Sequence, residues 1–472
     1  METLIKSESD ATPQNNDNDT NQREKTKNFP QYLAATAASI TLMVSGTNLG
    51  WPSPVLPKLM ETNATIFVTP DESTWIGSLV ALGAIFGPFP AGFAADFMGR
   101  KRALLLGALL HITSWCILTV AQSVSMIYAG RLLGGISNGW GMSLLPMYVG
   151  EIATPMTRGA LGVIGQIMIT SGFLYVYILG SLLSFVWLNI SCSLIPVIFF
   201  TFFFFMPESP YYELMKNNSK EAEKSLAKLR GKKPLEVKEE LNTLQAAVDE
   251  SFRETVHWTN IFKKRANRKA LLLMFGLMMA QQLSGINCVL FYSEIIFAKS
   301  GSSLSPSLST IIVGFVMFLT SFPTPYLVER LGRRTVLILS MTGMTLFLIL
   351  MGGFFCMEYF SYDTSNITWI PLFSVLGYIS FFSAGVGPVP WAMIGEMFAS
   401  NVRSLGASLT TSFSWILAFL LTKCFGIMQE YLGDYWTFWL FSVFCCIGVG
   451  FIYFCLPETK GKTLEEIQCN VV

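Results

Sequence analysis

Long apolar stretches recur along this chain and constrain its fold more than any other feature. The chain has 472 residues, 52% of them hydrophobic and 13% charged, and that charged fraction is about half the value typical of soluble domains. Each stretch is long enough to cross roughly 30 Å of hydrocarbon as a helix. We therefore predict an all-α polytopic membrane protein with about twelve transmembrane helices. The spans lie near residues 32–52, 75–95, 103–121, 125–147, 160–183, 186–206, 270–292, 307–328, 336–356, 370–393, 404–425 and 435–456.

Basic residues indicate which side of the membrane each loop faces. Lysine and arginine gather in alternate short loops, at Arg100–Arg102, Arg158, Arg330, Arg333, Arg334 and Arg403. The positive-inside rule assigns those loops to the cytoplasm, and an even number of spans places both termini there as well. The opposite loops carry the sequons at Asn63 and Asn366, which we expect to be glycosylated outside the cell, whereas Asn217 falls on the cytoplasmic side.

Polar segments divide the chain. Residues 1–30 are polar and without a signal peptide, so we predict a disordered cytoplasmic tail. Residues 208–268 are rich in lysine and glutamate and predict a cytoplasmic helical linker between two six-helix bundles, 31–207 and 269–457. A second cytoplasmic tail follows at 458–472.

Three motifs occur in the same order in both halves. Asp96-Phe-Met-Gly-Arg-Lys-Arg returns as Glu329-Arg-Leu-Gly-Arg-Arg, and Pro207-Glu-Ser returns as Pro457-Glu-Thr. Gly150-Glu151 precedes Arg158 by the same spacing with which Gly395-Glu396 precedes Arg403. Three motifs in register indicate a parallel internal repeat.

The composition argues against several classes of function. A net charge of +1 gives no basic excess for binding nucleic acid. The nine cysteines show neither CxxC spacing nor a disulfide framework, and His111 and His257 are too few for a zinc site, so we expect no metal and no cofactor. The spans contain no paired carboxylates or Ser/His arrangement, which argues against an enzyme.

The motifs together resemble those of the sugar porters of the major facilitator superfamily. The chain is similar to the facilitative glucose transporters and most closely to the insect facilitated trehalose transporters, over about residues 30–465. The resemblance rests on Asp96-x-x-Gly-Arg-Lys-Arg, Gly130-Arg-Leu-Leu-Gly-Gly, Glu151…Arg158-Gly, Pro207-Glu-Ser-Pro, Gln281-Gln-Leu-Ser-Gly-Ile-Asn287, Glu329-Arg-x-Gly-Arg-Arg, Gly385-x-Gly-Pro-x-Pro-Trp391 and Pro457-Glu-Thr-Lys-Gly. It implies a plasma-membrane carrier of a small-molecule sugar that works in the lipid bilayer as a monomer.

Charged residues at cytoplasmic helix ends are candidates for a gate. Ion pairs between helices there can form and break as the two halves rock, and when formed they would hold the inward side shut. A simpler interpretation is that such charges only terminate helices, but the repeat of Glu151 with Arg158 as Glu396 with Arg403 favours pairing. The predicted gating residues are Arg100, Glu151, Arg158, Glu329, Arg333, Glu396 and Arg403.

A sugar site needs neutral hydrogen-bonding groups between apolar walls. Amides inside apolar spans usually face a cavity or a neighbouring helix, and packing between helices is the alternative interpretation. Gly385, Gly387, Pro388 and Pro390 predict a broken tenth span beside the site. With the resemblance, the predicted sugar-binding residues are Gln166, Gln281, Gln282, Asn287, Tyr292, Trp391 and Ser414.

Coupling to protons is disfavoured by the first span. Related proton-driven symporters carry an aspartate where this chain has Asn48, and that acid pairs with the arginine that matches Arg131. Asn48 cannot ionise, so facilitative uniport of a sugar is the preferred mechanism, with a proton-coupled symporter or a non-transporting sugar sensor as alternatives. Met317 and Ser414 replace asparagines of the glucose carriers, which leaves trehalose, glucose and other solutes open as substrates.

Overall fold

The computed structural model describes residues 16–154, 157–253, 265–301, 304–398 and 402–460, and within these ranges all regular structure is helical. Two helical bundles are joined by a linker of short helices. The N-terminal bundle consists of α1 (Asn16–Gly50), α2 (Pro52–Leu59), α3 (Pro70–Phe86), α4 (Pro88–Met98), α5 (Arg100–Thr119), α6 (Val124–Ile152), α7 (Arg158–Leu182) and α8 (Phe185–Phe204).

The linker consists of α9 (Pro210–Met215), α10 (Ser219–Arg230), a short 3₁₀ helix (Pro234–Val237) and α11 (Lys238–Arg253). The C-terminal bundle consists of α13 (Arg265–Leu283), α14 (Ile286–Phe291), α15 (Ser293–Lys299), α16 (Pro306–Ser321), α17 (Thr324–Leu331), α18 (Arg333–Tyr359), α19 (Ile370–Phe381), a π-helical turn (Phe382–Val386), α20 (Val389–Met397) and α21 (Arg403–Cys455).

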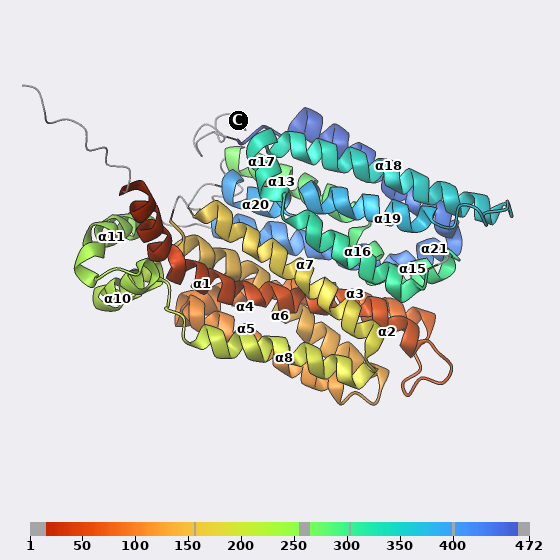
Figure 1. The fold of residues 1–472 in the computed structure, drawn as a ribbon, viewed down its shortest axis with the longest axis horizontal. Helices are drawn as coiled ribbons and strands as arrows, with labels where there is room; N and C mark the ends of the chain where they lie inside the picture. Colours follow the sequence, from red (N-terminus) through yellow and green to blue (C-terminus); the bar gives the residue numbers. More distant parts are fainter. Residues whose placement is uncertain (1–15, 155–156, 254–264, 302–303, 399–401, 461–472) are drawn as a thin grey trace, which may run out of the picture.

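The two bundles lie side by side with their helices roughly along one direction (Figure 1). The linker helices α10 and α11 lie at one end of the molecule, together with the beginning of α1 (Figure 1). We call this the linker end, and the end that carries α2 and α15 the far end. The two ends correspond to the two sides of the membrane that the helices span.

The predicted twelve spans are present, although several are bent. Seven helices are each long and apolar enough to cross a membrane, and counting the bent pairs α3 with α4 and α16 with α17 as single spans raises the number to nine among the described residues. α1 and α6 are also long, at 35 and 29 residues, but polar residues and glycines dilute their apolar character. α21, with 53 residues, contains two spans because Gly433 interrupts it with a φ of 81°.

The first helix begins earlier than the sequence predicts. α1 starts at Asn16, within the segment 1–30 that we predicted to be a disordered tail; residues 1–15 lie outside the described part. Residues 16–29 contain neither glycine nor proline, and lysine, glutamate, glutamine and arginine are good helix formers. Their polarity keeps them out of a core, but it does not stop the helix of the first span from continuing into them.

Close contact between α1 and α7 depends on two glycines. A methyl group at Gly46 would collide with the backbone carbonyl of Ile169, and one at Gly172 would collide with that of Met43. Small residues allow helices in a membrane to approach closely, where van der Waals packing replaces the hydrophobic effect as the source of association. The glycine pair thus fixes α7, which carries Gln166, against the first span.

Candidate functional site

The tenth span is broken at the predicted place, and Gln281 bonds to the break. α19 ends at Phe381, a π-helical turn covers Phe382–Val386, and α20 begins at Val389. The side-chain nitrogen of Gln281, on α13, donates to the carbonyl oxygens of Val386 and Gly387 at 2.6 and 3.0 Å. Backbone groups that a broken helix leaves free need such partners inside a membrane.

A chain of hydrogen bonds connects three more of the predicted residues. Gln282 donates from Nε2 to Oγ of Ser414 at 2.8 Å, and its Oε1 accepts from Nδ2 of Asn287 at 2.6 Å. Gln282 and Ser414 are buried, whereas Asn287 is half-buried. The structure therefore brings these three residues together across α13, α14 and α21, as a polar cluster within apolar spans.

Some polar atoms near these positions have no partner among the described residues. They are Oε1 of Gln281 and, on α21, Oγ1 of Thr410 and Nε1 of Trp415, all buried. A buried polar atom without a partner is costly, and a bound ligand or water can satisfy it. Thr410 and Trp415 are not among the predicted residues, since single hydroxyl and indole groups in an apolar span are commonplace. Trp415 directly follows Ser414.

The remaining predicted sugar-binding residues lie on three other elements. Gln166 is half-buried on α7, and its side-chain amide makes no hydrogen bond within the described part of the chain. Trp391 on α20 packs, partly buried, against a large apolar core to which both bundles contribute. Tyr292, between α14 and α15, is buried, stacks on Phe425 with ring centroids 5.3 Å apart, and lies against Gly77 of the other bundle.

Arg131 on α6 is fully buried, and its principal partner is Asn48. Its Nη1 donates to the side-chain and backbone oxygens of Asn48 at 2.6 and 2.7 Å, and its Nε donates to the carbonyl of Ile76 at 3.1 Å. The guanidinium also lies 5.0 Å from the ring centroid of Trp51, a cation–π distance. Neutral groups and an aromatic face thus surround this buried cation.

The predicted gating residues form two matching ion pairs. Arg100 pairs with Glu151, and Arg333 pairs with Glu396, each at 3.0 Å. Ser209 also donates to Glu151, as Thr459 does to Glu396 at 2.7 Å. The first pair lies within the N-terminal bundle and the second within the C-terminal bundle, so neither joins the two bundles in this conformation.

The structure describes less of the remaining predicted gating residues. Arg158 and Arg403 begin α7 and α21, but their side chains lie outside the described part. Glu329 is exposed, and it forms no ion pair with any residue that the structure describes.

Two carboxylates that the sequence analysis did not single out support the ion pairs. Glu208 accepts from the backbone nitrogen of Lys101 at 2.9 Å, and Glu458 accepts from those of Arg333 and Arg334 at 3.0 Å. Each carboxylate therefore caps the N-terminus of a spanning helix, where it also meets the positive end of the helix dipole. Burial raises the pKa of Glu208, while bonds from two backbone N–H groups oppose that rise. The recurrence of Pro-Glu-Ser as Pro-Glu-Thr was the signal that could have identified both.

The sequons lie as the predicted topology requires relative to the two ends. Asn63 follows α2 and Asn366 lies between α18 and α19, both exposed at the far end, while Asn217 is exposed beside α9 at the linker end. The structure describes no glycan, so occupancy stays a prediction.

The family of the chain is shown by its sequence. Residues 11–470 match the family model described as "Sugar (and other) transporter". The chain belongs to this family. Curated relatives include proteins named facilitated trehalose transporter Tret1 from Polypedilum vanderplanki and from Apis mellifera ligustica. Both are 38% identical, over 93% of this chain and over 88% and 87% of theirs. A relative of the same name from Drosophila mojavensis is 37% identical, and this transporter spans 51% of its length.

Solved structures confirm the fold. The proton:xylose symporter XylE bound to 6-bromo-6-deoxy-D-glucose superposes with a TM-score of 0.78 at 22% identity, over 95% of this chain and 100% of that one. XylE from E. coli in a partially occluded inward open conformation gives a TM-score of 0.77 at 21% identity, over 93% of this transporter and 100% of that chain. At these identities the likeness establishes the major facilitator fold alone.

Proposed function

We propose that this transporter carries trehalose or glucose across the plasma membrane by facilitative uniport. Its relatives that cover most of both chains are named facilitated trehalose transporters. The cluster of Gln281, Gln282, Asn287 and Ser414 supplies neutral donors and acceptors of the kind that sugar hydroxyls need. Several such bonds, at about 1 kcal/mol each and offset by ordering costs, correspond to millimolar affinity, about −4 kcal/mol.

The observation that carries uniport is the pairing of Arg131 with Asn48. A proton-coupled carrier needs a group inside the membrane that takes up and releases a proton during the cycle. The side-chain partner of Arg131 is an amide, which does not titrate in the physiological range. The carrier therefore completes its cycle without proton uptake by the side-chain partner of Arg131.

Transport proceeds by rocking of the two bundles around the polar cluster. The linker end faces the cytoplasm, and the far end faces outside, in accord with the positive-inside rule. The Arg100–Glu151 and Arg333–Glu396 pairs bind helices into rigid bundle ends, while Arg158, Arg403 and Glu329 contribute to closing the cytoplasmic side. The carrier works as a monomer, because each chain contains both bundles.

Uptake of labelled sugars into vesicles tests this proposal. Purified protein reconstituted into liposomes should equilibrate trehalose or glucose, and an imposed proton gradient should leave the rate unchanged. Sugar accumulation that requires the gradient and disappears with a protonophore would establish symport in its place. Saturable binding without flux of any tested sugar would establish a sensor.

A further inference from the structure

One place where the two bundles meet toward the far end is an antiparallel pair of helices, α3 and the first half of α21. Near the middle of the molecule, Oγ of Ser412 donates to the carbonyl of Ile85 at 3.2 Å. Further out, the rings of Phe419 and Trp75 lie 6.3 Å apart. These contacts follow the two helices toward the far end, where a charged side chain completes the row.

Lys423 is that charged side chain, and it makes three contacts with the other bundle. Its Nζ lies 2.9 Å from Oδ1 of Asp71 and donates to Oγ1 of Thr74 at 2.8 Å. The same ammonium lies 4.3 Å from the ring centroid of Trp75, within cation–π range. The side chain of Lys423 is 19% exposed, whereas that of Asp71 is 80% exposed.

The acceptor side of this contact is rigid. Thr69 and Glu72 form a capping box at the start of α3, with Oε2 of Glu72 accepting from the backbone nitrogen of Thr69 at 2.9 Å. The capping box engages the carboxylate of Glu72 and fixes the start of α3. The first two turns of α3 present Asp71, Thr74 and Trp75 to the other bundle. Lys423 therefore binds a preformed surface, so little ordering is needed on that side when the contact forms.

We propose that Lys423 is a latch that holds the far ends of the bundles together and so sets the fraction of carriers closed on that side. All three partners of its ammonium belong to the opposite bundle, so all three contacts are lost when α21 and α3 separate at that end. The latch acts as a positioning device and does not touch the sugar. In the proposed orientation it closes the outer side of the transporter.

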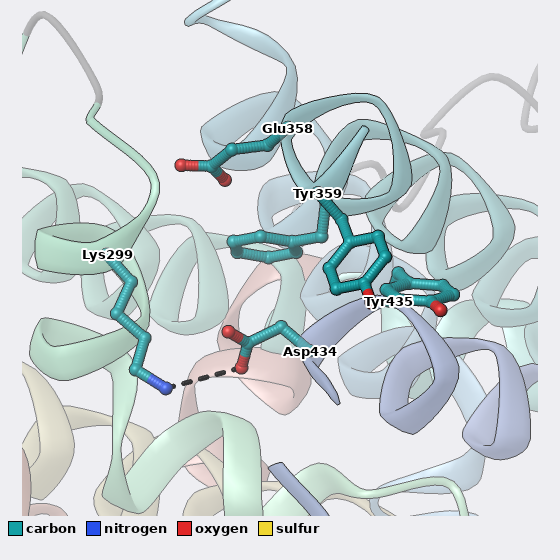
Figure 2. A pocket seen from close by; sticks show the side chains of 6 residues that line it. Lys299, Glu358, Tyr359, Asp434 and Tyr435 are labelled. Atoms are coloured by element: carbon teal, nitrogen blue, oxygen red, sulfur yellow. Dashed lines mark hydrogen bonds and ion pairs between the residues drawn. The ribbon is translucent and has the colours of Figure 1, made fainter. Parts of the chain in front are cut away.

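A second lysine at the same end provides a matched control. Nζ of Lys299 lies 3.3 Å from Oδ1 of Asp434, and both residues line a cavity of about 380 Å³ with Phe355, Glu358, Tyr359 and Tyr435 (Figure 2). This ion pair joins α15 to α21, two elements of one bundle, so separation of the bundles leaves it intact. Lys299 also borders Pro57 and Met60 of the other bundle, but its ammonium forms no ion pair with that bundle among the described residues. Lys299→Met therefore removes a far-end cation and an ion pair without removing an ion pair between the bundles.

The test measures opening directly, without sugar. Ser53 on α2 is fully buried, and its Oγ accepts from the backbone nitrogen of Glu294 in the other bundle at 3.2 Å. A cysteine placed there by Ser53→Cys becomes accessible when the far end opens. Cells that express the full chain are treated with a membrane-impermeant maleimide, and labelling is corrected for the same protein without Ser53→Cys.

Adding Lys423→Met should raise the labelling rate by about tenfold, because the closed state loses one hydrogen bond, one exposed ion pair and one cation–π contact. Asp71→Asn should raise it by less, because two of the contacts remain, and Lys299→Met should leave it unchanged. Exchange of the charges, Lys423→Asp with Asp71→Lys, should bring the rate back toward that of the unchanged latch.

Two outcomes would overturn the latch. The first is that Lys423→Met and Lys299→Met give the same labelling rate. The second is that Asp71→Asn alone raises the labelling rate but the charge exchange does not lower it again. The result is separable from the proposed function. Labelling that occurs only after the cells are permeabilised would refute the proposed orientation and not the latch, and labelling does not depend on which sugar, if any, is carried.

Discussion

Arg131 and Asn48 are joined by a 2.6 Å hydrogen bond between a guanidinium nitrogen and an amide oxygen, with both side chains buried in the N-terminal bundle. A charged arginine within a membrane usually has an acidic partner. Here Asn48 supplies two oxygens, from its side chain and its backbone, and Trp51 supplies the face of its ring. The side-chain partner of this buried guanidinium is thus an amide and not a carboxylate.

Replacing Asn48 by aspartate should make transport depend on pH. The new carboxyl would lie at hydrogen-bonding distance from Arg131, and its ionisation would follow the access of water to each side. We expect that an imposed pH gradient leaves the rate of sugar flux through the unmodified protein unchanged. The rate of flux through Asn48→Asp should vary with pH between about 5 and 8. Asn48→Ser, which removes the amide without adding an acid, serves as the control and should show no pH dependence.

Tracer uptake into proteoliposomes at fixed and imposed pH measures this difference. Accumulation of sugar above its external concentration by the unmodified protein would mean that a carboxylate elsewhere couples transport to protons, and Glu151, Glu294 and Glu396 would be the groups to replace first.

The two ion pairs at the linker end should contribute unequally to stability. The side chains of Arg100 and Glu151 are 4% and 15% exposed, against 23% and 28% for Arg333 and Glu396. Removing one partner of a buried pair leaves the other charge unpaired, so Arg100→Ala should cost about 3 kcal/mol, while Arg333→Ala should cost about 1 kcal/mol. Thermal unfolding of both variants in detergent measures the difference. A larger loss in Arg333→Ala would show that burial does not govern these pairs.

The arginines that begin α7 and α21 should affect turnover more than binding. Arg158 and Arg403 follow Glu151 and Glu396 at the same spacing, and each begins a spanning helix, α7 or α21. Residues that bias a rocking equilibrium change how fast the carrier reorients, while leaving the contacts with the ligand intact. We expect Arg158→Ala and Arg403→Ala to lower the maximal rate several-fold with little change in equilibrium sugar binding. A loss of binding as large as the loss of rate in both variants would contradict a gating role.

Repetition made the fold, and the charged residues at the helix ends, predictable from sequence, but not which of those residues pair. Hydropathy predicted the number of spans, and the repeat of the motifs in both halves identified Arg100, Glu151, Arg333 and Glu396 as candidates. The sequence associated Glu151 with Arg158 and Glu396 with Arg403, whereas the structure pairs Glu151 with Arg100 and Glu396 with Arg333. The break in the tenth span followed from its glycines and prolines. These features depend on local chemistry or on comparison of one half with the other, which a single sequence contains.

Contacts that depend on how the bundles meet could not be predicted. Lys423 and Asp71 lie 352 residues apart, and they touch only because this conformation closes the far end. The sequence likewise predicted that Gln281 lies in a span, but it did not indicate that the amide nitrogen of Gln281 donates to the carbonyls of Val386 and Gly387. The early start of α1 was missed because polarity was taken to exclude a helix.

The bond from Gln282 to Ser414 gives a prediction for sugar affinity. Ser414→Ala removes the acceptor of a buried amide nitrogen, which should lose its fixed orientation, and we expect the half-saturation concentration for sugar to rise by about fivefold, or about 1 kcal/mol. Ser442→Ala is a matched control, because that hydroxyl, also on α21, bonds to the carbonyl of Trp439 in its own helix and to no other group that the structure describes. Initial rates of uptake over a range of sugar concentrations give the half-saturation concentration of each variant. An equal rise in both variants would show that Ser414 does not belong to the sugar site.

Glycan mapping tests the sidedness on which the transport direction and the latch depend. Asn63, Asn366 and Asn217 are all exposed, so exposure cannot distinguish them; the first two lie at the far end and the third at the linker end. A fourth sequon, Asn189-Ile-Ser191, is not available for modification, since the amide of Asn189 is buried and bonded to Trp51 and to the carbonyl of Leu118 at 2.8 and 3.1 Å. Because glycans are added only on the outer side, Asn63→Gln and Asn366→Gln should each remove a glycosidase-sensitive mobility shift, and Asn217→Gln should change nothing. A glycan at Asn217 would place the linker outside and invert the whole topology.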